Sequence, residues 1–172
     1  MDARRESEPT PMKNRTTTER KSDRELVVTR TFNGPAHLVF EAWTKPELFK
    51  RWWVPKSMGM SLLACEMDVR VGGKYRLVFG VGGATVMEVF GKYIEVTPHS
   101  RLVWTNEESD EGSVTTVTFA EKGGKTLLVM HELYPSKEAL DAAGTGAADA
   151  MGETFEQLDE LLVTFDASVG RS

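Results

Sequence analysis

Cysteine is almost absent from this chain, which contains a single one, Cys65, among its 172 residues. A lone cysteine excludes an internal disulfide, and no Cys-x-x-Cys pattern of a redox or zinc site surrounds it. Such cysteine usage is typical of a reducing compartment. The first residues also lack the apolar segment of a secretory signal, so a cytoplasmic location is expected.

Long apolar runs and an excess of basic residues are missing as well. No stretch approaches the roughly 20 apolar residues that a helix needs to cross a bilayer. The chain carries 26 acidic against 21 basic residues, which gives a net charge of −5. Since an acidic chain without a basic block has no attraction for phosphate groups, neither nucleic acid nor a membrane surface is expected as a partner.

The signature motifs of common catalysts are also missing. The glycine pairs between strand-like runs are typical of hairpin turns, because no G-x-x-x-x-G-K-[ST] phosphate loop contains them. No G-x-S-x-G nucleophile elbow is present. The three histidines, His37, His99 and His131, lack metal-ligand spacing, so neither a metal nor another cofactor is expected.

The elements that are present predict one α+β domain at residues 24–166. Residues 1–23 are charged and nearly free of apolar side chains, which predicts a flexible polar tail, and 167–172 form a short C-terminal tail. Within the domain, a strand at 25–32 is followed by two short helices and then by strand-like runs joined by short turns. The final helix carries an apolar stripe of Met151, Phe155, Leu158, Leu162 and Phe165. That stripe must bury against the antiparallel sheet, the only large surface available.

Several stretches of the sequence, taken in this order, resemble the motifs of a known family. They are P-A-H-L-V-F-E-A-W-T-K-P-E-L-F-K-R-W-W-V-P (35–55), V-G-G-K-Y-R (71–76), G-K-Y-I-E-V-T-P (91–98), R-L-V-W-T (101–105), T-L-L-V-M-H-E (126–132) and L-D-E-L-L (158–162). Together they resemble the START-like, or helix-grip, superfamily, and within it the branch named for the activator of the heat-shock-protein-90 ATPase. The resemblance covers about residues 25–165. It implies a curved antiparallel sheet wrapped around a long C-terminal helix, with two short helices after the first strand.

The resemblance also implies a cavity between the sheet and the C-terminal helix, which the superfamily uses for apolar small molecules. An apolar or aromatic ligand is therefore expected, and methionines suit such a site because thioether side chains adapt to irregular shapes. Core packing is the competing explanation for the same side chains. The predicted wall residues are Trp53, Phe79, Met87, Trp104, Met130, Met151 and Phe155.

Tryptophans gather at Trp43–Pro55, which holds three of the four in the chain. Large apolar rings suit both packing and ligand stacking. This cluster is predicted to close one end of the curved sheet and to supply part of the cavity wall.

Two further functions stay open for the same fold. As an enzyme resembling the superfamily's cyclases, the chain would use His131 as acid or base, because histidine titrates near neutral pH. A structural histidine is the competing interpretation, and strand alternation places Glu132 on the opposite face. As a chaperone-binding module, the chain would use its outer surface. Apolar residues on both faces of 127–130 predict that a subunit partner, as in a homodimer, or the short helices cover the second face.

Overall fold

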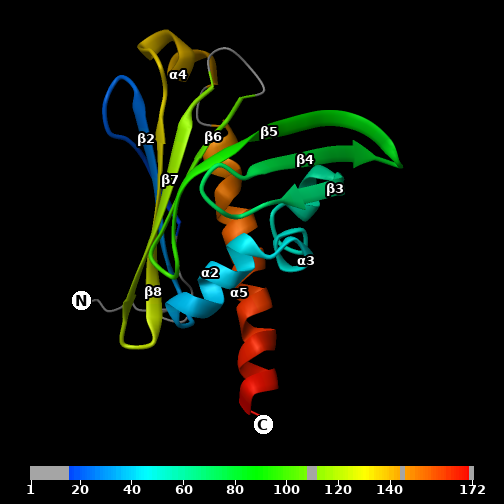
Figure 1. The fold of residues 1–172 in the computed structure, drawn as a ribbon, viewed down its shortest axis with the longest axis vertical. Helices are drawn as coiled ribbons and strands as arrows, with labels where there is room; N and C mark the ends of the chain where they lie inside the picture. The colour runs from blue at the N-terminus through cyan, green and yellow to red at the C-terminus, as the bar shows by residue number, and fades with distance from the viewer. Residues whose placement is uncertain (1–15, 108–111, 144–145, 171–172) are drawn as a thin grey trace, which may run out of the picture.

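The computed structural model describes residues 16–107, 112–143 and 146–170, and within them one antiparallel sheet dominates (Figure 1). Its eight strands lie in the order β1-β2-β8-β7-β6-β5-β4-β3. The strands are β1 (Thr17–Arg20), β2 (Glu25–Phe32), β3 (Ser61–Met67), β4 (Lys74–Val81), β5 (Ala84–Thr97), β6 (Arg101–Thr105), β7 (Val114–Lys122) and β8 (Lys125–Leu133). The helices are α2 (Ala36–Thr44), α3 (Pro46–Phe49), the short 3₁₀ turn η2 (Lys56–Met58), α4 (Lys137–Ala143) and α5 (Gly146–Gly170).

The sheet is built from hairpins that the glycine pairs close. Gly123 and Gly124, between β7 and β8, both have positive φ, 62° and 80°. This left-handed geometry matches the twist of an antiparallel pair and is one that residues with a Cβ rarely adopt. The pair therefore fixes the register in which Lys122 lies opposite Lys125.

The core lies between the sheet and α5, as the helix-grip fold requires. Figure 1 shows α5 passing along the sheet, with α2 and α3 beside it under the strands β3 to β5. Phe32 of β2 and Phe155 of α5 are fully buried and meet edge to face, with ring centroids 5.3 Å apart. Burying a side chain of this size stabilises the fold by about 1.5–3 kcal/mol. The α+β helix-grip architecture predicted from the sequence is confirmed.

The C-terminal helix buries most of its predicted stripe. Met151, Phe155, Leu158 and Leu162 are all buried, while the side chain of Phe165 lies outside the described ones. The helix continues to Gly170, so it enters the segment 167–172 that was expected to be a tail. None of the described helices is long and apolar enough to cross a bilayer.

Part of the segment expected to be a flexible N-terminal tail is a strand. Residues 17–20 form β1 and pair with β2, with Thr17 opposite Thr29. All four residues are exposed, because β1 lies at the sheet edge and buries no side chain. Its stabilisation comes from backbone hydrogen bonds and from an ion pair, 2.8 Å, between Arg20 and Asp141. A polar edge strand has no hydrophobic pattern, so composition alone predicts a tail there. Residues 1–15 lie outside the described ones.

An ion pair in the core joins the sheet to α5. Arg30 of β2 is 4% exposed and donates to Asp159 of α5, with Nη2 2.7 Å from Oδ2. Arg30 also donates to Thr16 Oγ1 at 2.8 Å, and the second oxygen of Asp159 accepts the backbone N–H of Asn33. A charge buried this deeply is tolerated only with its partner in place. The pair therefore sets the position of α5 along β2.

Candidate functional site

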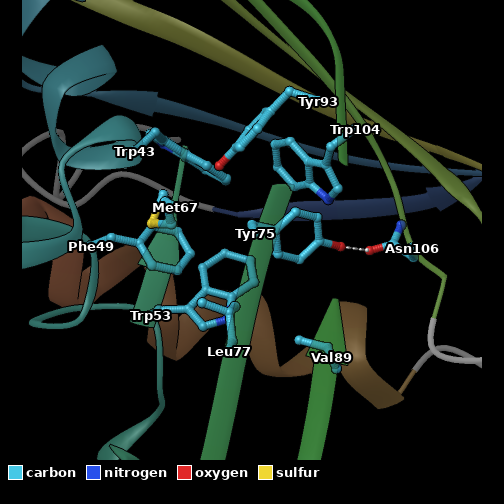
Figure 2. A pocket seen from close by; sticks show the side chains of 10 residues that line it. All are labelled: Trp43, Phe49, Trp53, Met67, Tyr75, Leu77, Val89, Tyr93, Trp104 and Asn106. Carbon is cyan, nitrogen blue, oxygen red and sulfur yellow. Dashed lines mark hydrogen bonds between the residues drawn. The ribbon is translucent and has the colours of Figure 1, made fainter. Parts of the chain in front are cut away.

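A cavity of about 60 Å³ lies where the strands β3 to β6 face α2, α3 and the segment after α3 (Figure 2). Ten residues line it: Trp43, Phe49, Trp53, Met67, Tyr75, Leu77, Val89, Tyr93, Trp104 and Asn106. Five of them are buried and the other five are half-buried, so the cavity reaches from the core towards the surface. All ten side chains are uncharged, and six are aromatic.

The location of this cavity corrects one expectation. A cavity between the sheet and the C-terminal helix was predicted, but no α5 residue is among the ten lining residues. The space under α5 is filled instead, because Phe155 and Leu158 are fully buried against the sheet. The cavity lies beside α5, at the end of the sheet that the short helices close.

The aromatic wall is centred on Trp43, near the C-terminal end of α2. Pro35 precedes the helix with φ −72°, and Val39, Ala42 and Trp43 then fall on its buried side. Trp43 is only 1% exposed, and its ring centroid lies 4.9 Å from that of Trp52 and 5.9 Å from that of Trp104. This ring therefore joins the core to the cavity.

The two central indoles differ in their hydrogen bonding. Nε1 of Trp52 donates to the carbonyl oxygen of Ala42 at 3.0 Å. Nε1 of Trp43 has no acceptor, and among the described side chains it is the one fully buried nitrogen or oxygen atom that lacks a partner. Buried donors are paired in the great majority of cases, so this N–H is an unusual feature of the core beside the cavity.

Side chains of α5 hold the outer wall in place. The segment 52–57, here called the Trp53 strap, follows α3 and carries Trp53, whose ring stacks on Phe49 at 4.7 Å. Gln157 donates through Nε2 to the carbonyl oxygens of Trp52 and Val54, both at 2.9 Å. Its Oε1 accepts the backbone N–H of Lys56, also at 2.9 Å. The helix therefore positions the wall without lining the cavity.

Two more α5 side chains support the Trp53 strap. Thr154 Oγ1 donates to the carbonyl oxygen of Trp53 at 3.3 Å, and Glu153 accepts the backbone N–H of Ser57 at 3.0 Å. Hydrogen bonds from the Ser57 hydroxyl and N–H lower the pKa of Glu153, so its carboxylate stays ionised as an acceptor.

Polar groups gather at one end of the cavity, where a chain of hydrogen bonds leads to the inner face of β8. Tyr75 Oη lies 2.9 Å from Asn106 Oδ1, the contact drawn in Figure 2. Asn106 Nδ2 donates to Ser113 Oγ at 3.1 Å and to Thr115 Oγ1 at 2.9 Å. Ser113 Oγ in turn donates to Glu132 Oε1 at 2.9 Å. Glu132 is thus the carboxylate linked to the cavity, and it lies on the face of β8 opposite His131, where strand alternation placed it.

Two ionisable groups at the cavity, Tyr93 and Cys65, are held neutral by burial, which raises the pKa of each. Burial raises the pKa of the Tyr93 hydroxyl far above its ordinary value, so it remains protonated and able to donate. In Figure 2 this hydroxyl points towards Trp43. Burial likewise raises the pKa of the nearby Cys65 thiol to about 11. The cavity therefore offers hydrogen-bond donors without any charge.

The seven predicted wall residues divide into three groups. Trp53 and Trp104 line the cavity. Phe79, Met130, Met151 and Phe155 are buried in the core outside the lining, and Met87 is 45% exposed near the end of the β4–β5 hairpin. Tyr75 and Leu77, which line the cavity, were not predicted. They share one face of β4 with Phe79 by strand alternation, a signal that could have found them, but only Phe79 was selected from this face. Trp43 belongs to the tryptophan cluster that was predicted to supply part of the wall, whereas the approach of Tyr93 to that face depends on distant segments and left no local pattern.

His131 lies away from the cavity, on the outer face of β8. Residues Thr126, Leu128 and Met130 alternate inward, whereas His131 alternates outward. Its Nε2 is 2.8 Å from Glu25 Oε2 on β2, and this hydrogen bond lowers the pKa of Glu25. The position matches the structural interpretation of this histidine. Leu127, on the same outer face, is 43% exposed in the single chain.

Comparisons with known proteins agree with the predicted resemblance. The family model described as Activator of Hsp90 ATPase homolog 1-like protein matches residues 33–163. A solved protein from Rhodobacter sphaeroides is similar at 27% identity and a TM-score of 0.80, covering 87% of this chain and 99% of its own. One from Nitrosomonas europaea has 25% identity and a TM-score of 0.75, covering 86% and 99%. A third, from Mycobacterium smegmatis, shares the fold at 21% identity and a TM-score of 0.74, covering 86% and 96%. No curated protein matches the chain.

Proposed function

The chain belongs to the family described as Activator of Hsp90 ATPase homolog 1-like protein, and on that basis we propose that it binds a small apolar or aromatic molecule. The observation that carries the proposal is the uncharged, largely aromatic lining of the cavity beside Trp43. Ligand sites in proteins are concave and mostly apolar, with a few polar groups that fix orientation. The Tyr75–Asn106 pair and the Tyr93 hydroxyl supply such groups here.

The volume of the cavity limits the size of the ligand that it can hold unless one of its walls moves. Its volume of about 60 Å³ is below the roughly 300–1,000 Å³ of typical ligand pockets. A ring-sized ligand therefore needs a wall that moves outward. The Trp53 side chain is the suitable wall, because Trp53 is half-buried. Its neighbour Trp52 is fully buried in the core and anchors the strap, and hydrogen bonds from Gln157 and Thr154 of α5 hold the backbone.

Native mass spectrometry of the freshly purified protein tests the proposal. We expect an adduct that is lost when the protein is denatured. If the spectrum shows only the mass of the protein, the protein is titrated with naphthalene, a small neutral aromatic hydrocarbon. Binding of naphthalene is then the readout. Failure to detect either an adduct or naphthalene binding would overturn the proposal.

A cavity-filling variant locates the site. Leu77→Trp adds an indole inside the lining, whereas Leu127→Trp adds the same group on the exposed outer face. Overpacking costs about 1–3 kcal/mol, so circular dichroism should first show that Leu77→Trp is folded. We expect Leu77→Trp to lose the adduct or the naphthalene binding and Leu127→Trp to keep it. Retention in the folded Leu77→Trp protein would place the ligand elsewhere.

Binding of a chaperone is the second candidate, and the family description supports it. In this case the outer surface would carry the function and the cavity would be part of the core. A pull-down with a purified chaperone of the heat-shock-protein-90 class tests this candidate. The cyclase-like alternative has less support, because its catalytic candidate, His131, lies on the outer face of β8.

A further inference from the structure

We propose that the ligand of this cavity is an uncharged ring compound whose neutral oxygen, as in a phenol or an aryl ketone, hydrogen-bonds to the Tyr93 hydroxyl. This inference rests on the proposed binding function and specifies the class of ligand. Tyr93 lines the cavity and is 4% exposed. Figure 2 shows its ring beside that of Trp104, with the hydroxyl pointing away from its own strand and in among the lining side chains.

The Tyr93 hydroxyl has no partner within the described part of the chain. None of the residues that the structure describes forms a hydrogen bond with its oxygen. The oxygen nevertheless keeps accessible surface, because the only fully buried, unpaired nitrogen or oxygen among the described side chains is the Trp43 indole nitrogen. Since Tyr93 is otherwise buried and lines the cavity, that surface is open to the cavity, and a ligand there can reach it.

The other tyrosine of the lining is already paired. Tyr75 Oη lies 2.8 Å from the Thr105 carbonyl oxygen and 2.9 Å from Asn106 Oδ1, so its hydroxyl helps to hold β4 and β6 together. The Tyr93 hydroxyl holds nothing in this way, and its burial costs the hydrogen bond to water that it makes in the unfolded chain. An oxygen that arrives with a ligand restores that bond.

The lining also decides the charge of the ligand. All ten lining side chains are neutral, so a carboxylate or phosphate would lose its hydration without gaining an opposite charge. Burial raises the pKa of Tyr93, so the group stays a hydroxyl, which can both donate and accept. It can therefore pair with a hydroxyl or a carbonyl oxygen, and the aromatic walls suit a flat apolar ring attached to that oxygen.

Three probes with one aromatic ring each separate the oxygen from the ring. Toluene and phenol are nearly the same size and differ in a methyl group against a hydroxyl, and benzoate carries a charge. Their dissociation constants are measured by ¹H–¹⁵N NMR titration of the ¹⁵N-labelled protein at pH 7. The test variant, Tyr93→Phe, removes only the unpaired hydroxyl. The matched control, Tyr75→Phe, removes the paired hydroxyl at the polar end of the same cavity.

We expect the affinity for phenol relative to toluene to fall about three- to tenfold in Tyr93→Phe, the value of one hydrogen bond. Comparing this ratio between variants cancels the different hydration of the probes and any general change of cavity shape. Tyr75→Phe should keep the wild-type ratio. In urea unfolding, Tyr93→Phe should have a midpoint no lower than the wild type, because the hydroxyl that it removes stabilises nothing, whereas Tyr75→Phe should have a lower midpoint.

The outcomes separate this inference from the function on which it rests. If none of the three probes binds the wild type, the proposed binding function fails. If toluene and phenol bind with the same ratio in the wild type and in Tyr93→Phe, the Tyr93 inference fails while binding stands. A ratio that falls only in Tyr75→Phe would place the ligand oxygen at the Asn106 end and overturn the inference.

Two further results would also contradict it. A clear loss of stability or of folding in Tyr93→Phe would show that the hydroxyl has a partner within the folded chain. Tighter binding of benzoate than of phenol would overturn the conclusion that the ligand is uncharged.

Discussion

Removing the Gln157 side chain should loosen the Trp53 strap and measurably destabilise the protein. Gln157 is 8% exposed and makes three hydrogen bonds of 2.9 Å to the backbone at residues 52, 54 and 56. A hydrogen bond contributes about 0.5–1.5 kcal/mol net, so the three together contribute about 3 kcal/mol. We therefore expect Gln157→Ala to lower the free energy of unfolding by about that amount.

The matched control is Glu156→Ala, one position earlier on the same helix. Glu156 is exposed, and exposed substitutions usually change stability by less than about 0.5 kcal/mol. Gln157→Glu is the isosteric test. It keeps the oxygen that accepts from the Lys56 N–H but replaces the donating NH₂ group with a second oxygen. That oxygen faces the carbonyl oxygens of Trp52 and Val54, to which it cannot donate. This substitution should destabilise at least as much as Gln157→Ala at neutral pH.

Urea unfolding at equilibrium, followed by circular dichroism, gives the free energies, and acrylamide quenching reports on the strap. Because Trp53 is the half-buried tryptophan of the strap, its release should increase the quenching of tryptophan fluorescence in Gln157→Ala under native conditions. A Gln157→Ala protein that matches Glu156→Ala in both stability and quenching would refute the conclusion that Gln157 holds the wall of the cavity.

Three other perturbations follow from the described contacts. Asp159→Ala should cost about 3–5 kcal/mol in urea unfolding, because it leaves the buried Arg30 charge unpaired, and a loss below about 1 kcal/mol would contradict this. His131→Ala should raise the pKa of Glu25, measured by NMR titration, towards the ordinary 4.5, because the hydrogen bond that lowers it is removed; an unchanged pKa would show that the pair does not form. The Cys65 thiol, with its pKa raised to about 11 by burial, should react with a disulfide reagent at pH 8 about a hundredfold more slowly in the native protein than in urea, and equal rates would argue against its burial.

The arrangement of the core was largely predictable from the sequence, because burial repeats along each element. In β4, Tyr75, Leu77 and Phe79 alternate with polar or smaller residues, and all three point inward in the structure. In α5, Met151, Phe155 and Leu158 recur at helical spacing and are buried. Periodicity of this kind follows from backbone geometry alone. It can therefore be recognised in the sequence without knowing which surface the side chains pack against.

The edge strand and the buried ion pair were not predictable in this way. β1 has four exposed polar residues and is stabilised by backbone hydrogen bonds to β2. Because the backbone of any sequence can form such bonds, the side chains of β1 carry no pattern that predicts a strand. Arg30 occupies an inward position of β2 that periodicity assigns to an apolar residue, and its partner Asp159 follows 129 positions later. Neither feature has a local signature.

The sequence by itself determined which residues face inward, where the glycine turns close the hairpins, and to which family the chain belongs, since these depend on local spacing and on ordered motifs. The tertiary structure decided where the cavity lies and which side chains share it. Trp43, Tyr93 and Trp104 come from α2, β5 and β6, and they meet because the sheet curves towards the short helices while α5 fills its own side. The unpaired Trp43 N–H is likewise a property of the packed structure, because whether a buried donor finds an acceptor depends on every segment that surrounds it.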